Sequence, residues 1–167
     1  MTGPVHPLDR VLDRLLVVGR EAYAERDTVR VDEGVPVADV ELPDSFAVAS
    51  LIDEVAPVTG GGPRRTARTT HRAFDIGCAV QCATGDPDVT ALRKHAFDVY
   101  GDLLAVLRRD RRLGIPELVL NSWVAQEGYR PVVAEPDEDQ DEYGQSFAAL
   151  VLLEFVIHVE IYEVEER

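Results

Sequence analysis

Residues 71–114 read HRAFDIGCAVQCATGDPDVTALRKHAFDVYGDLLAVLRRDRRLG, and this stretch predicts a strand followed at once by a helix. Apolar side chains alternate from Phe74 to Cys82, the period of a strand with one buried face. Asp86-Pro87-Asp88 is typical of a helix start, because carboxylates accept from free N–H groups and proline suits the first turn. Apolar residues then recur every three or four positions until basic residues and Gly114 end the helix.

The chain before this stretch predicts a helix, a short strand and a hairpin strand. Apolar residues at helical spacing favour an amphipathic helix from Pro7 to about Asp27. Residues 29–40, interrupted by glycine and proline, indicate a short edge strand and an extended connection. Alternation over Ser45–Val58 predicts a strand with one face fully buried. A glycine-rich segment at about 57–70 then forms a long mobile hairpin loop that leads to the return strand.

The chain after this stretch predicts further strands. Glu117–Gln126 and Tyr129–Ala134 indicate two short strands separated by a turn, and Phe147–Val164 indicates a long central or hairpin strand. The fold class expected is α+β, a mostly antiparallel β-sheet covered on one face by two α-helices. A chain of 167 residues suits one domain over 1–167.

The charge balance excludes some classes of partner. Seventeen basic against 31 acidic residues leave a formal charge of −14, which disfavours sequence-independent binding to nucleic acid or to an anionic membrane. Residues 1–7 lack the pattern of a secretory signal, and the uncharged stretch 143–153 is shorter than the roughly 20 residues of a membrane helix. We therefore expect a soluble protein that stays in the cytoplasm where it is made.

Residues that often carry chemistry do not form a familiar pattern. The glycines at 60–62 lack the Lys-Ser or Lys-Thr pair of a phosphate loop, and no serine lies in a Gly-x-Ser-x-Gly elbow. Cys78 and Cys82 are expected to be buried and inert, about 13 Å apart on one strand and too far apart for a disulfide. The histidines, which lack metal-binding spacing, are His6, His71, His95 and His158. We expect no catalytic residue, no cofactor and no metal site.

Two charged segments remain to be explained. The acidic segment, at about 135–143, contains Glu135, Asp137, Glu138, Asp139, Asp141 and Glu142. The basic segment, within the predicted mobile loop, contains Gly60, Gly61, Gly62, Arg64, Arg65 and Arg68, and Arg72 follows shortly after it. One interpretation is that both are solvated loops without a partner. The other is head-to-tail self-association, because a contact that joins two different patches can close into a ring.

The order of these elements resembles the tail-terminator proteins of long-tailed bacteriophages. The resemblance lies in the opening helix, the hairpin with its long loop, the stretch 71–114 and the final strand FAALVLLEFVIHVEIYEVE at 147–165. It implies a non-enzymatic virion protein, assembled in the host cytoplasm, that caps the tail tube as a hexameric ring and stops its growth. Its implied partners are other copies of itself, the tail-tube protein and a neck or head-completion protein, with DNA only as passing cargo and no membrane.

The resemblance also suggests roles for the two charged segments. The basic segment serves as an assembly arm that orders on contact with a partner. The acidic segment forms an interface or faces the ring channel, where negative walls repel the phosphates of passing DNA.

Three other functions remain open from sequence. The first is a different neck protein, for head completion or tail completion. The second is a small-molecule-binding or catalytic α+β domain, which needs polar groups that converge in the core. The third is an acidic DNA-mimic inhibitor.

Overall fold

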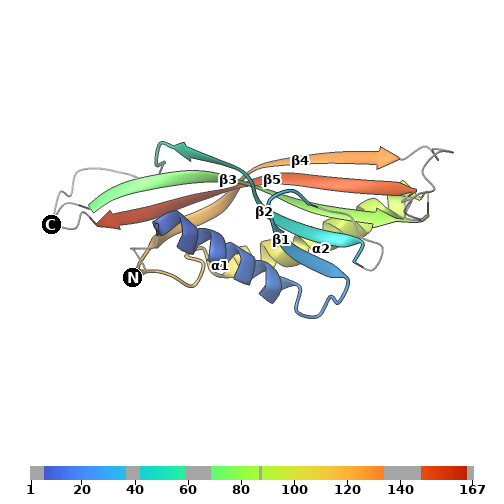
Figure 1. Cartoon of the computed structure of the whole chain (residues 1–167), viewed down its shortest axis with the longest axis horizontal. Coiled ribbons are helices and arrows are strands. Elements are labelled where there is room, and N and C mark those ends of the chain that lie inside the picture. Colours follow the sequence, from blue (N-terminus) through green and yellow to red (C-terminus); the bar gives the residue numbers. More distant parts are fainter. Residues whose placement is uncertain (1–5, 37–41, 59–68, 87, 134–147, 165–167) are drawn as a thin grey trace.

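The computed structural model describes residues 6–36, 42–58, 69–86, 88–133 and 148–164. Within these ranges the elements are α1 (Pro7–Ala22), β1 (Val29–Glu33), β2 (Asp44–Val55), β3 (Thr69–Thr84), α2 (Val89–Arg109), β4 (Val119–Val133) and β5 (Ala149–Val164). The strands form one five-stranded sheet in the order β1-β2-β3-β5-β4. Only the β1–β2 pair is parallel. Both helices lie on one side of the sheet (Figure 1), which confirms the predicted α+β class.

The centre of the sheet is the antiparallel pair of β3 and β5. The two strands are in register along their full length of 16 residues, from Thr69 opposite Val164 to Thr84 opposite Ala149. The apolar series from Phe74 to Cys82 and the odd-numbered residues of β5 from Val151 to Ile161 are buried on the side of the helices. The sequence therefore predicted the buried face of both strands correctly, and β5 is a central strand.

Both helices have capped starts. Pro7 begins α1, and the His6 side chain accepts a hydrogen bond from the backbone N–H of Leu8. Asp88 caps α2 by accepting from the N–H of Ala91 at 3.1 Å, whereas Asp86 accepts from the N–H of Asp88 in the preceding turn. The helix thus begins two positions later than the sequence suggests, because the first aspartate stabilises the turn instead.

The end of α2 is also set by an aspartate. The helix stops at Arg109, and the Asp110 carboxylate accepts hydrogen bonds from the backbone N–H groups of Arg112 and Gly114. Leu113 and Gly114 both have positive φ in this turn. Helix α1 ends at Ala22, earlier than the predicted Asp27, because the chain turns at Tyr23 and enters β1 at Val29.

Strand β2 differs from the prediction because it contains a bulge. Val48 lies opposite Cys78 but Leu51 lies opposite Gly77, so two residues of β2 have no partner in the ladder, and Ala49 has φ +64°. Before the bulge both faces of β2 are buried, including Ala47, whereas Leu51 after it is 64% exposed. A bulge increases the local twist and bends the strand, and in Figure 1 β2 changes direction midway. The prediction of one buried face over 45–58 is therefore wrong beyond Val48.

Strand β4 is one strand where the sequence predicts two. Gly128 and Tyr129 do not turn, since they continue the ladder with β5 opposite Glu154 and Leu153. Register shifts at 119–121 and 124–126 take up the extra residues instead. Similarly, β3 begins at Thr69, so the last two residues of the predicted loop belong to a strand.

Helix α1 approaches β2 most closely at Gly19. A Cβ atom at this position would lie 2.6 Å from Cδ1 of Phe46 and 3.1 Å from Cγ1 of Val31. Phe46 is fully buried between Tyr23 and Phe155. Its ring therefore has no free space to move into.

We predict that Gly19→Ala destabilises the protein by about 1–3 kcal/mol, because the added methyl group overpacks the core. Gly101 is the matched control, since it lies on the exposed side of α2 with no atom within 4 Å of an added Cβ. Gly101→Ala is expected to stabilise by about 0.5–1 kcal/mol through the higher helix propensity of alanine. Urea unfolding of both variants measures the difference, and equal effects would contradict the close approach.

Candidate functional site

The residues predicted from sequence to form the assembly arm and the acidic surface lie outside the described residues. They are Gly60, Gly61, Gly62, Arg64, Arg65, Arg68, Glu135, Asp137, Glu138, Asp139, Asp141 and Glu142. Arg72 is placed, but in β3, where it forms an ion pair with Glu54 at 2.8 Å and lies over the Phe74 ring. It therefore belongs to the sheet and not to the loop.

The two charged segments join the sheet at its opposite ends. The chain enters β3 from the basic segment at Thr69, opposite Val164 at one end of β5. It leaves β4 for the acidic segment at Val133, opposite Ala149 at the other end of β5. The 16 residues of β5 separate these points by about 50 Å (Figure 1).

The sheet face opposite the helices carries an open groove of about 650 Å³. Its apolar walls include Val35, Leu51, Leu152 and Val156, and Gly77 lies in the sheet beneath it. Within the described ranges no helix covers this face. The groove is an apolar surface of the kind that protein partners cover.

Three polar residues of this same face form a cluster, in which His158 and Glu160 are buried and Asp75 is partly exposed. His158 of β5 has its Nδ1 2.7 Å from Oδ1 of Asp75 in β3 and its Nε2 3.2 Å from Oε1 of Glu160. Trp123 of β4 lies against the imidazole, with ring centroids 4.4 Å apart. Each of the two ring nitrogens of His158 thus lies within hydrogen-bond distance of a carboxylate oxygen. The backbone N–H of Val58 also donates to Glu160, which ties the end of the β2 segment to β5.

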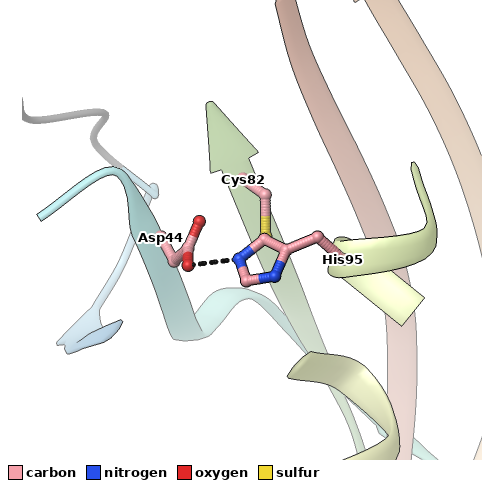
Figure 2. A group of neighbouring side chains, drawn as sticks. All are labelled: Asp44, Cys82 and His95. Atoms are coloured by element: carbon pink, nitrogen blue, oxygen red, sulfur yellow. Dashed lines mark hydrogen bonds and ion pairs between the residues drawn. The ribbon is translucent and has the colours of Figure 1, made fainter. Parts of the chain in front are cut away.

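A second cluster, Asp44, Cys82 and His95, lies on the helix side of the sheet (Figure 2). Asp44 is the first residue of β2, Cys82 lies opposite it in β3, and His95 comes from the second turn of α2. Nε2 of His95 is 2.6 Å from Oδ2 of Asp44, and one possible ligand atom from each residue lies within 4.8 Å of the others. The sequence pattern missed this group because it placed the start of the strand after Asp44 and could not place the helix over it.

Burial determines the chemistry of the two thiols. It raises the pKa of Cys78 to about 12, and it raises the pKa of Cys82 further, with the nearby Asp44 carboxylate adding to the increase. Both thiols are therefore neutral at physiological pH, and the prediction that they are buried on one face of the strand is confirmed.

Polar groups therefore do converge in the interior, although the sequence offered no local pattern for either cluster. Asp44 and Glu160 are both at most 3% exposed, and each has a histidine partner. The sequence separations, 51 residues for Asp44 with His95 and 83 for Asp75 with His158, exceed the range of any local motif.

We predict that His158→Leu destabilises the protein by about 3–5 kcal/mol, because it removes the histidine partner of the fully buried Glu160 carboxylate. His71→Leu is the control. His71 is a partly buried histidine of β3, and the aromatic ring that it contacts in the described part of the chain is Tyr162, edge-on. Its cost is expected to stay within about 1.5 kcal/mol. Thermal and urea unfolding measure both values, and a His158→Leu variant as stable as the unaltered chain would refute the ionic role.

Comparison with known proteins finds a structural similarity and no sequence match. No protein family and no curated protein sequence matches this chain. It is similar to a solved structure of the PVC sheath/tube terminator, in the extended state, of an extracellular contractile injection system. The two are 15% identical with a TM-score of 0.43, and the alignment covers 99% of this chain and 58% of that one. The chain thus spans little more than half the length of that terminator. In the described part of the chain no helix is long and apolar enough to cross a membrane.

Proposed function

We propose that this chain is a tail-terminator protein whose copies join end to end into a hexameric ring. The ring caps a tail tube, ends its polymerisation and presents a surface to a neck or head-completion protein. No copy carries out a reaction in this proposal. The solved structure reported above is also a terminator protein. The proposal rests, however, on the surfaces of this chain and on the resemblance of its order of elements to tail terminators.

The observation that carries the proposal is the attachment of two oppositely charged segments to opposite ends of one sheet. Basic residues of 64–68 immediately precede the start of β3, and acidic residues of 135–142 follow the end of β4. A contact between the two ends of neighbouring copies is heterologous, and such contacts generate a ring when the rotation between copies closes. The charges of the two segments are complementary between copies, and the points where the segments join the sheet are about 50 Å apart along β5.

The overall charge makes this arrangement necessary for self-association. With a formal charge of −14, two copies repel each other unless opposite charges meet locally. Exposed ion pairs contribute at most about 1 kcal/mol each, so the contact needs several pairs and also apolar area. The groove along Val35, Leu51 and Val156 offers that area to a neighbouring copy or to the tail tube.

The two charged segments have further roles in this proposal. The basic segment with Gly60, Gly61 and Gly62 is the assembly arm, and its glycines let the backbone follow the surface of a partner. Carboxylates of the acidic segment that remain unpaired line the channel, where they repel the phosphates of the passing genome. The assembled ring is part of a virion or of a related injection particle.

The function is tested with tail tubes assembled from a purified tail-tube protein. We expect the purified protein to form a ring at one end of each tube and to stop further growth, as seen by electron microscopy and by the tube-length distribution. Deleting 60–68 is expected to abolish capping, since the arm is lost. Tubes that remain uncapped and keep growing in the presence of the unaltered chain would contradict the proposal.

A charge-reversal experiment tests the contact between copies. We predict that changing Arg64, Arg65 and Arg68 to Glu prevents ring formation, and that changing Glu138, Asp139 and Asp141 to Lys does the same. Combining both sets restores the ring, because the pairs are reversed and not lost. Changing the three arginines to lysine is the matched control and keeps the ring.

Native mass spectrometry and light scattering, with tail tubes present and absent, report the assembly state in this experiment. Assembly of the unaltered chain is expected to weaken in about 1 M salt, where charges are screened beyond about 3 Å. The variant that combines both sets of substitutions decides the matter. If it fails to assemble, as each set alone does, the two segments do not pair between copies.

A further inference from the structure

We propose that Asp44, Cys82 and His95 bind one divalent transition-metal ion, with zinc as the metal that the donor set fits best. This inference does not depend on the proposed function, because it concerns the interior of a single copy. A metal here would join β2, β3 and α2.

The three residues are positioned by regular structure. Asp44 and Cys82 are direct partners in the antiparallel ladder of β2 and β3, so their side chains lie on the same face of the sheet. Helix α2 packs over that face and directs His95 towards the pair (Figure 2). Sites built on strands and helices hold their ligands more closely in place than sites on loops.

The three donors differ in kind, and together they select the metal. A thiolate sulfur, an imidazole nitrogen and a carboxylate oxygen suit zinc and similar transition metals, whereas calcium and magnesium prefer oxygen ligands only. Tetrahedral zinc with normal bond lengths places neighbouring ligand atoms about 3.4–3.6 Å apart. The three atoms already lie within 4.8 Å of one another. The cluster is therefore close to the size of a zinc site.

Binding requires one local change. Oδ2 of Asp44 and Nε2 of His95 are 2.6 Å apart, so they must separate by about 1 Å to admit the ion between them. The His95 side chain is 42% exposed and can rotate outward, whereas Asp44 is almost fully buried. The imidazole exchanges its contact with the carboxylate for a bond to the metal.

The position of Asp44 supports a ligand role. It precedes Phe46 and Val48 in the alternating series that faces the helices, where a carboxylate is costly unless it is paired. Besides His95, the hydroxyl of Thr28 lies 3.5 Å from the same oxygen, at the limit of a hydrogen bond. A cation compensates a buried carboxylate more completely than these two contacts do.

The site is open on one side. A pocket of about 420 Å³ reaches Asp44 and His95, and its rim carries the carboxylates of Asp86 and Asp88. This opening admits the ion and leaves room for a water molecule as the fourth ligand. When the metal binds, the Cys82 thiol exchanges its S–H bond for a sulfur–metal bond and releases the proton to solvent, with no oxidation or reduction.

The test is titration of the full-length, untagged and reduced protein, freed of metal, with cobalt(II) alone. We expect one equivalent to produce the thiolate-to-cobalt charge-transfer band and the visible bands of tetrahedral cobalt. Added zinc is expected to remove both sets of bands, and zinc is expected to raise the melting temperature of the unaltered chain.

Cys78 provides the matched control, because it is buried on the same face of the same strand but belongs to no such cluster among the residues that the structure describes. Cys78→Ser keeps the cobalt spectrum, whereas Cys82→Ser loses the charge-transfer band. His95→Ala changes a partly exposed side chain and so leaves the fold intact. Its affinity is expected to fall by more than the roughly 10–100-fold that loss of an outer-shell partner costs.

Three outcomes would overturn the site. They are the absence of any charge-transfer band in the unaltered chain, a band that persists in Cys82→Ser, and unchanged cobalt affinity in His95→Ala. If Cys82→Ser fails to fold, His95→Ala and Asp44→Asn decide the matter by the same titration, since unchanged affinity in both excludes the cluster.

Discussion

The antiparallel pairing of β3 with β5 is the constraint on which the rest of the structure depends. Over 16 residues it places Phe74, Ile76 and Cys78 beside Val159, Ile157 and Phe155 on one face. Because side chains alternate, a slip of one residue would move every apolar side chain of a strand to the other face. Helix α2 packs on this apolar face, and α1 packs against α2 and the neighbouring strands β1 and β2.

The outer strands adapt to this central pair in different ways. Strand β4 follows β5 throughout its length by means of two register shifts, and it remains one strand despite Gly128 and Pro131. Strand β2 pairs with β3 on both sides of a bulge at Ala49, and beyond the bulge it turns away from the core. The helices cover one face, and among the described residues the groove of the other face stays open.

Both buried polar clusters arise from cross-strand partners. Asp44 faces Cys82 across β2 and β3, and Asp75 faces His158 across β3 and β5. A third residue completes each cluster, His95 from the helix in one and Glu160 from the same strand in the other. Only the addition of Glu160 to His158 could be predicted from the sequence, because residues two apart in a strand share a face. The two clusters lie on opposite faces of the sheet and serve different purposes.

Local sequence patterns were enough to predict the element types, the apolar faces of β3, α2 and β5, and the burial of the two cysteines. These follow from local periodicity and capping, which depend on neighbouring residues only. Only the tertiary structure decided the continuity of β4, the bulge in β2, the opposite ends at which the charged segments attach, and the meeting of Asp44 with His95. Each of these depends on register between strands or on helix packing, and residues distant in sequence set both.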